Sequence, residues 1–242
     1  MRADILGVPF DAVTPEEAVR RGMELMEGGG GRVVTPNPEI VWKCHTDPAA
    51  REAVVSADLI LADGVGILKA AKKLGRPLRD RVLGIEWFYA MLALCAEKEK
   101  SVFFLGGKPG VAGQAAKNAA QTHPALKVCG AHDGFFTDED AVAERIRQAG
   151  PDFLAVSLGA PKQELWMARN APKLPGVLMA GLGGSLDILA GGVKRAPKIF
   201  SKLGLEWLYR ALRQPSRIPR LLVIPKFLRL VGKTAKREKK HG

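Results

Sequence analysis

Along residues 1–193, short apolar runs alternate with longer segments in which apolar and polar positions are mixed. The runs are rich in valine, isoleucine, leucine and phenylalanine, a composition typical of buried strands. We predict strands at residues 32–35, 58–62, 101–105, 152–158 and 176–180, with weaker patterns near 4–8 and 126–130.

The segments between these runs carry residues that start helices. In TPEE at 14–17, Thr14 can cap a helix, Pro15 suits its first position and Glu17 completes a capping box. DPAA at 47–50 and TDED at 137–140 predict similar starts. Strands that alternate with helices are joined by crossover connections, so the pattern predicts an α/β fold with a mostly parallel sheet flanked by helices.

The segments that directly follow the strands are the first place to look for a site, because ligands of open α/β sheets bind beyond the carboxyl ends of the strands. These segments are TPNPE at 35–39, DGVG at 63–66, GGKPG at 106–110, GAPKQE at 159–164 and GLGGSLD at 181–187. Several of them lead into a helix, whose first backbone N–H groups can bind a phosphate.

Three polar residues in the first two segments are candidates for chemistry. Asp63 follows an apolar strand and precedes a glycine, so it could act as a general base, or it could only cap the next helix. Thr35 and Asn37 lie on a loop stiffened by two prolines and could bind a sugar hydroxyl. The alternative for that loop is an ordinary turn.

The remaining segments offer groups for a nucleotide. Gly106, Gly107 and Gly110 form a glycine turn before a helix, which suits a diphosphate, although the segment matches neither GxGxxG nor a P-loop and could be a tight turn without a ligand. Gln163 can donate and accept hydrogen bonds, as uracil requires, or it could belong to a surface Lys-Gln pair. Arg81 could bind a phosphate or be solvated.

Metal, cofactor and disulfide chemistry have little support in the sequence. The acidic run at 138–140 resembles a metal-binding DxD pair, but we interpret it as the first turn of a helix, where acids are favoured. The four histidines lack zinc-ligand spacing, and the three cysteines form no CxxC pair. The lack of a secretory leader favours a reducing compartment, and the lack of a long apolar run argues against a membrane-spanning helix. We expect neither a metal nor a cofactor.

Charge divides the 242-residue chain, whose net charge is +12, into two parts. Residues 194–242 hold 15 lysines and arginines against two acids, whereas residues 1–193 hold 22 against 23. We therefore expect a nearly neutral domain over 1–195 and a basic appendage over 196–242.

The appendage has an apolar face as well as its charge. Phe227, Leu228, Leu230 and Val231 recur at helical spacing among basic residues, which predicts amphipathic segments on an anionic membrane surface. A packed C-terminal helix with a frayed basic end is the alternative. A nucleic-acid-binding protein is a competing hypothesis, but a phosphate-binding arm gains little from aliphatic residues. A nicotinamide-dependent dehydrogenase is disfavoured because GxGxxG is missing.

Seven segments together resemble, in order, the motifs of the WecG/TagA/CpsF family of bacterial glycosyltransferases. They are TPNPEIV, LADGVGI, GGKPGVAGQAA, GAPKQELW, GGSLDILAG, KRAPKIF and GLEWLYRALRQPSRIPR, and they extend to about position 220. Within the family the chain looks most like the TagA branch of wall teichoic acid synthesis. Glu86 stands where members of the family often have Asp, and we assign it no role.

The resemblance implies a Rossmann-like core and a metal-independent, inverting transfer. The implied donor is UDP-N-acetylmannosamine, and the acceptor is the 4-hydroxyl of GlcNAc on undecaprenyl diphosphate, giving a β-1,4 linkage. N-acetylmannosaminuronic acid or another UDP-sugar is the alternative donor. The implied location is cytoplasmic, peripheral on the inner face of the cell membrane, and a homo-oligomer is compatible with the sequence.

The resemblance also implies roles for individual residues. Asp63 matches the general base, Thr35 and Asn37 the polar pair that faces the transferred sugar and the acceptor, Arg81 the arginine near the diphosphate, and Gln163 the glutamine at the nucleotide. The UDP-sugar side further includes Gly106, Gly107, Gly110, Gly184 and Asp187, and the appendage offers Arg210, Arg213, Arg217 and Arg220 as residues that could reach over the site.

Overall fold

The computed structural model describes residues 1–193 and 222–241. Its centre is a six-stranded sheet in which every neighbouring pair of strands is parallel. The strand order is β4 (Leu59–Ile60), β3 (Gly31–Val34), β8 (Leu178–Gly181), β7 (Phe153–Ser157), β5 (Ser101–Gly106) and β6 (Lys127–His132). The fold is α/β and Rossmann-like, as predicted.

Helices cover both faces of the sheet because successive strand side chains point to opposite sides. Val34 and Phe103 belong to one buried cluster and Val33 and Phe104 to the other. Helices α1 (Pro15–Glu27), α5 (Gly84–Glu97), α6 (Val111–Thr122) and α9 (Ser185–Leu189) contribute to the second cluster. The first cluster receives α2 (Pro38–Thr46), α3 (Pro48–Val55), α4 (Val65–Lys73), α7 (Glu139–Ala149), α8 (Lys162–Asn170) and α13 (Val223–His241); the short 3-10 helix η1 (Ala171–Lys173) follows α8.

The predicted helix starts are confirmed. Thr14 accepts a hydrogen bond from the N–H of Glu17, whose carboxylate accepts one from the N–H of Thr14. Asp47 caps α3 and Asp138 caps α7. The acidic run at 138–140 is therefore a helix start. Within it, Glu139 forms an ion pair with Arg169.

The strand predicted near 4–8 is wrong as a single strand. The chain reverses there, and β1 (Arg2–Ile5) pairs antiparallel with β2 (Val8–Asp11) outside the main sheet. Leu6 and Gly7 turn the chain with positive φ angles of 57° and 85°. The buried carboxylate of Asp11 accepts hydrogen bonds from Arg2, Arg21 and the N–H of Ile60, so it fastens the hairpin to β4.

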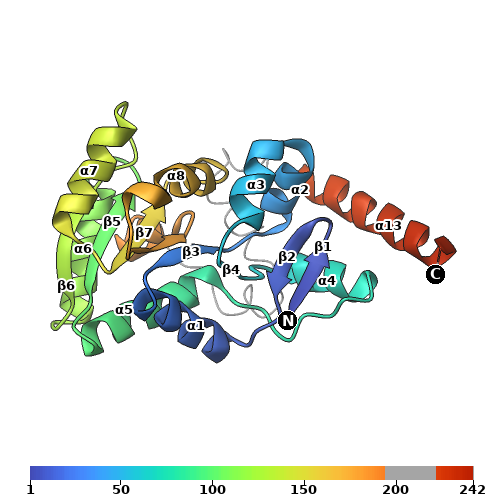
Figure 1. Cartoon of the computed structure of the whole chain (residues 1–242), viewed down its shortest axis with the longest axis horizontal. Coiled ribbons are helices and arrows are strands. Elements are labelled where there is room, and N and C mark those ends of the chain that lie inside the picture. The colour runs from blue at the N-terminus through green and yellow to red at the C-terminus, as the bar shows by residue number, and fades with distance from the viewer. Residues whose placement is uncertain (194–221, 242) are drawn as a thin grey trace.

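The final helix, α13, packs on the body through its apolar face. Phe227 and Val231 are fully buried in the cluster that includes α2 and α4, both of which α13 contacts. Figure 1 shows α13 extending past α2 at the opposite end of the molecule from β6. These two side chains therefore face protein rather than a membrane, as in the alternative of a packed C-terminal helix, whereas Leu228 is 48% exposed.

The rest of the basic appendage lies outside the described residues. This part includes the predicted domain boundary at 195 and the candidates Arg210, Arg213, Arg217 and Arg220. Within residues 1–193 and 222–241, no helix is both long and apolar enough to cross a membrane.

Candidate active site

The loops that the sequence singles out leave the sheet at a common edge. Each begins where a parallel strand ends, so the segments after β4, β3, β8, β7 and β5 all emerge at the carboxyl ends of the strands. Their order along this edge is that of the strands. The loops after β4 and β3 are neighbours, and the loop after β5 lies about 19 Å from the loop after β4, at about 4.8 Å for each strand spacing.

The loop after β3 is held in place by its own polar side chains. The Thr35 hydroxyl is buried and donates to the carbonyl oxygen of Gly181 on neighbouring β8, 3.1 Å away. Asn37 caps α2, because its side-chain oxygen accepts from the N–H groups of Glu39 and Ile40 at 2.9 and 3.1 Å. With its oxygen engaged in this way, the amide NH₂ is the part of Asn37 that can bind a ligand.

Asp63 follows β4 directly beside this loop. Its backbone N–H donates to the carbonyl oxygen of Pro36 at 3.3 Å, and the residue is half-buried. The N-cap position of α4 is Gly64, the residue after Asp63. A Cβ on Gly66 would lie 2.7 Å from Cγ of Pro38, so only glycine lets the first turns of α4 and α2 approach this closely.

Arg81 reaches the same place from the segment that precedes α5. The N–H of Val82 donates to the carbonyl oxygen of Ala62 at 3.2 Å, which runs this segment along the end of β4. At the start of α5, Gly84 lies against Thr35, where an added Cβ would be 3.2 Å from the Thr35 hydroxyl oxygen. The fold thus gathers the backbones of Thr35, Asn37, Asp63 and Arg81 at one end of the sheet edge.

The glycine turn after β5 lies further along the edge. A Cβ on Gly106 would be 2.3 Å from the carbonyl oxygen of Ser157, and the N–H of Gly107 donates to that oxygen at 3.0 Å. Glycine is therefore required where the turn touches β7. Gly110 precedes α6, and the turn borders a depression of about 280 Å³ lined by Gly110, Ala112, Gly113, Ala131, His132, Asp133 and Arg145.

The side chain of Gln163 is buried and bound within the protein. It is 2% exposed, its oxygen accepts from the N–H of Gly183 at 3.0 Å, and its NH₂ donates to Glu164 at 2.8 Å. The alternative of a surface Lys-Gln pair is therefore wrong. Both ends of the amide are bound within the protein, and its role at the nucleotide stays a prediction. Gly184 and the half-buried Asp187, at the start of α9, follow the same loop.

Sequence reasoning missed Glu164, whose side chain is completely buried. Burial raises the pKa of its carboxyl group to about 7, against the lowering effect of the hydrogen bond from Gln163. A glutamate in the first turn of a helix usually faces solvent, so the pattern gives no signal for this burial.

A parallel α/β sheet with polar loops and a glycine turn along its carboxyl edge is typical of enzymes that act on nucleotide-linked substrates. The sequence profile of the glycosyl transferase WecG/TagA/CpsF family matches residues 3–241. The chain belongs to this family, as its motifs predict, and is a glycosyltransferase.

Two relatives carry the same descriptive name, N-acetylglucosaminyldiphosphoundecaprenol N-acetyl-beta-D-mannosaminyltransferase. The protein from Bacillus spizizenii is 37% identical over 209 residues, which cover 86% of this chain and 81% of the relative. The protein from Staphylococcus aureus strain MW2 is 36% identical over 242 residues, which cover 99% of this chain and 95% of the relative.

Proposed function

We propose that this glycosyltransferase moves N-acetylmannosamine from UDP-N-acetylmannosamine to the 4-hydroxyl of GlcNAc on undecaprenyl diphosphate, as in the assembly of the teichoic acid linkage unit. The observation that carries the proposal is the similarity, over nearly the full length, to relatives named for N-acetyl-beta-D-mannosaminyl transfer to this lipid-linked GlcNAc. The gathering of Thr35, Asn37, Asp63 and Arg81 at the carboxyl edge of the sheet supports it.

The proposed reaction is a single displacement with inversion that forms a β-1,4 linkage. The Asp63 carboxylate takes the proton of the acceptor hydroxyl while the hydroxyl oxygen forms a bond to the anomeric carbon. The bond from that carbon to the UDP oxygen breaks, and UDP leaves with the electron pair. Thr35 and Asn37 hold the transferred sugar and the acceptor.

Charge that develops on the diphosphate needs positive groups or N–H donors. In this proposal Arg81, the backbone of the Gly106–Gly110 turn and arginines of the appendage stabilise the departing UDP without a metal. Gly184 and Asp187 border the donor on the side of β8.

A comparison of donors tests the function. Turnover is measured with UDP-N-acetylmannosamine, UDP-N-acetylmannosaminuronic acid and UDP-glucose against one lipid-diphosphate-GlcNAc analogue, and the products are identified by mass spectrometry. We expect transfer from UDP-N-acetylmannosamine to exceed the others by at least about tenfold, the discrimination that one or two polar sugar contacts provide. Preferred transfer of either other sugar would replace this assignment.

We also propose that the enzyme works at the inner face of the cell membrane, held there by basic residues. The described part of the appendage supports this, because the face of α13 away from the body exposes Lys226, Arg229, Lys233, Lys236 and Arg237. Each basic residue near an anionic surface contributes about 1 kcal/mol.

Replacing these five residues with glutamine should abolish co-sedimentation with phosphatidylglycerol vesicles. A matched control replaces three lysines and two arginines exposed elsewhere: Arg20, Lys98, Lys117, Lys127 and Arg147. Equal loss of vesicle binding in both variants would show that net charge, rather than α13, holds the protein to the membrane.

A further inference from the structure

Buried polar side chains concentrate beneath the loop that follows β8. Four of them hydrogen-bond to the backbone of residues 181–183. Thr35 donates to the carbonyl oxygen of Gly181, Ser157 to that of Gly183, and Ser185 to that of Leu182 at 2.8 Å, whereas the Gln163 oxygen accepts from the N–H of Gly183. A loop at the carboxyl edge is thus fixed by polar side chains from β7, α8, α9 and the loop after β3.

Gln163 can hold this loop only in one orientation of its amide. Its oxygen must face the N–H of Gly183, and its NH₂ must then face Glu164, whose Oε1 accepts at 2.8 Å. With the amide reversed, the NH₂ would meet the N–H of Gly183 donor to donor. The absence of a side chain on Gly181 leaves room for this amide, since a Cβ there would lie 3.0 Å from its nitrogen.

The burial of the Glu164 side chain costs free energy. Its side chain is fully buried, and its second oxygen, Oε2, has no hydrogen-bond partner among the residues that the structure describes. An apolar residue would pack at this position without the cost of burying an unpaired polar atom. The hydrogen bond to Gln163 is the contact that a leucine could not make.

We propose that Glu164 is a positioning residue: it sets the orientation of the Gln163 amide, which holds the N–H of Gly183 and fixes the loop that borders the donor sugar-nucleotide. The part that concerns the donor rests on the proposed function. In this arrangement Gln163 acts on the donor through the loop rather than by direct contact.

Three variants test the proposal: Glu164→Leu removes the acceptor, Glu164→Gln keeps an oxygen in place, and Glu144→Gln makes the same chemical change at an exposed glutamate of α7. The first readout is hydrogen exchange of the Gly183 amide. In Glu164→Leu we expect exchange about tenfold faster, the equivalent of one buried hydrogen bond. Glu164→Gln and the control should exchange like the unmodified protein.

The second readout separates positioning from chemistry. A loop that binds the donor equally in the ground state and the transition state affects KM and leaves kcat unchanged. For Glu164→Leu we expect the KM for UDP-N-acetylmannosamine and the Kd of UDP to rise about tenfold. Glu164→Gln should restore both.

Unchanged Gly183 exchange in Glu164→Leu would overturn the proposal, and so would a tenfold fall in kcat at constant KM. If Glu164→Leu does not fold, Glu164→Asp, which is shorter by one methylene, removes the same contact and is judged by the same readouts. The assignment of the donor can be wrong without affecting this test. If UDP-N-acetylmannosamine is not a substrate, hydrogen exchange at Gly183 and the Kd of UDP still decide the role of Glu164.

Discussion

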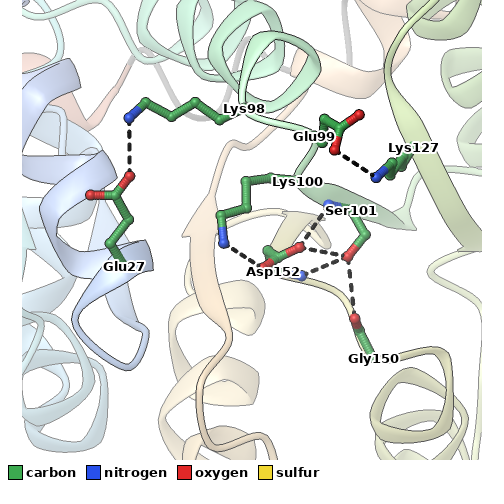
Figure 2. A network of polar contacts seen from close by, with 8 residues as sticks. All are labelled: Glu27, Lys98, Glu99, Lys100, Ser101, Lys127, Gly150 and Asp152. Atoms are coloured by element: carbon green, nitrogen blue, oxygen red, sulfur yellow. Dashed lines mark hydrogen bonds and ion pairs between the residues drawn. The ribbon is translucent and has the colours of Figure 1, made fainter.

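The polar groups of the central sheet are satisfied differently at its amino edge, where the parallel strands begin, and at its carboxyl edge, where they end. At the amino edge, Figure 2 shows Asp152 accepting from the Lys100 ammonium, the Ser101 N–H and the Ser101 hydroxyl at 3.1, 2.7 and 2.9 Å. At the carboxyl edge, Thr35, Gln163 and Glu164 are buried and spend their hydrogen bonds on loop backbone or on each other.

The size of a hollow does not distinguish these edges. The amino edge has a depression of about 280 Å³ beside Gly150, Asp152 and Val177, as large as the one beside Gly110. Its polar groups pair with each other, and although burial alone would raise the pKa of Asp152, hydrogen bonds from Ser101 and Lys100 lower it. The polar groups of the amino edge thus bind each other and hold two strands together. At the carboxyl edge, polar side chains fix loops whose other polar groups can bind a substrate.

The largest effect should come from Asp63 at the carboxyl edge. Replacement by asparagine keeps the shape of the side chain but removes the proposed base, so turnover should fall about 10²–10⁴-fold while UDP binding persists. Steady-state kinetics and calorimetric titration with UDP measure the two quantities. Turnover within about tenfold of the unmodified enzyme would exclude Asp63 as the base.

Glu164 should make the stability of the carboxyl edge depend on pH. Because its folded pKa of about 7 lies above the ordinary 4.5, its stabilising contribution is complete below pH 4.5 and is lost as the pH rises through 7. Glu39, on α2, raises the pKa of Glu164 further. On the same helix, burial and then the charge of Glu164 raise the pKa of the Cys44 thiol.

Glu164→Gln cannot ionise, so it should gain about 3 kcal/mol in unfolding free energy relative to the unmodified protein between pH 4.5 and pH 8. Urea unfolding at several pH values measures this difference. A difference that does not change with pH would show that Glu164 does not titrate in this range.

Asp152→Asn at the amino edge should have the smallest effect. It weakens one ion pair that is about one-third exposed and leaves the hydrogen-bond acceptor largely in place, so unfolding free energy should fall by about 1 kcal/mol. Urea unfolding measures that loss, and steady-state kinetics should give an unchanged kcat/KM. A large fall in kcat/KM would remove the functional distinction between the edges.

Much of the fold can be predicted because strands buried on both faces appear as apolar runs, as at 101–105 and 152–158. The hairpin at residues 2–11 escaped prediction because its turn places a leucine, Leu6, at positive φ, where turns usually have glycine or asparagine. The face of α13 illustrates another limit, since an amphipathic pattern is the same whether Phe227 packs on protein or on lipid.

For the candidate site, the position of a segment after a strand identified the loops. It did not show which of their side chains lie together or which are buried. Thr35 and Asp63 reach the same end of the edge because β3 and β4 are neighbours, and strand order is a tertiary property. The burial of Gln163 and Glu164 depends on how α8 packs against other helices, which their own sequence does not encode.

The docking of α13 has a consequence for how the enzyme would meet the lipid-linked acceptor proposed above. The helix rests on α2 and α4, and these two begin next to Asn37 and Asp63. If the exposed side of α13 lies on the bilayer, the candidate base is carried at a set height and tilt above the lipid headgroups. The acceptor then needs only to diffuse within the plane of the membrane, so its search for the enzyme takes place in two dimensions instead of three.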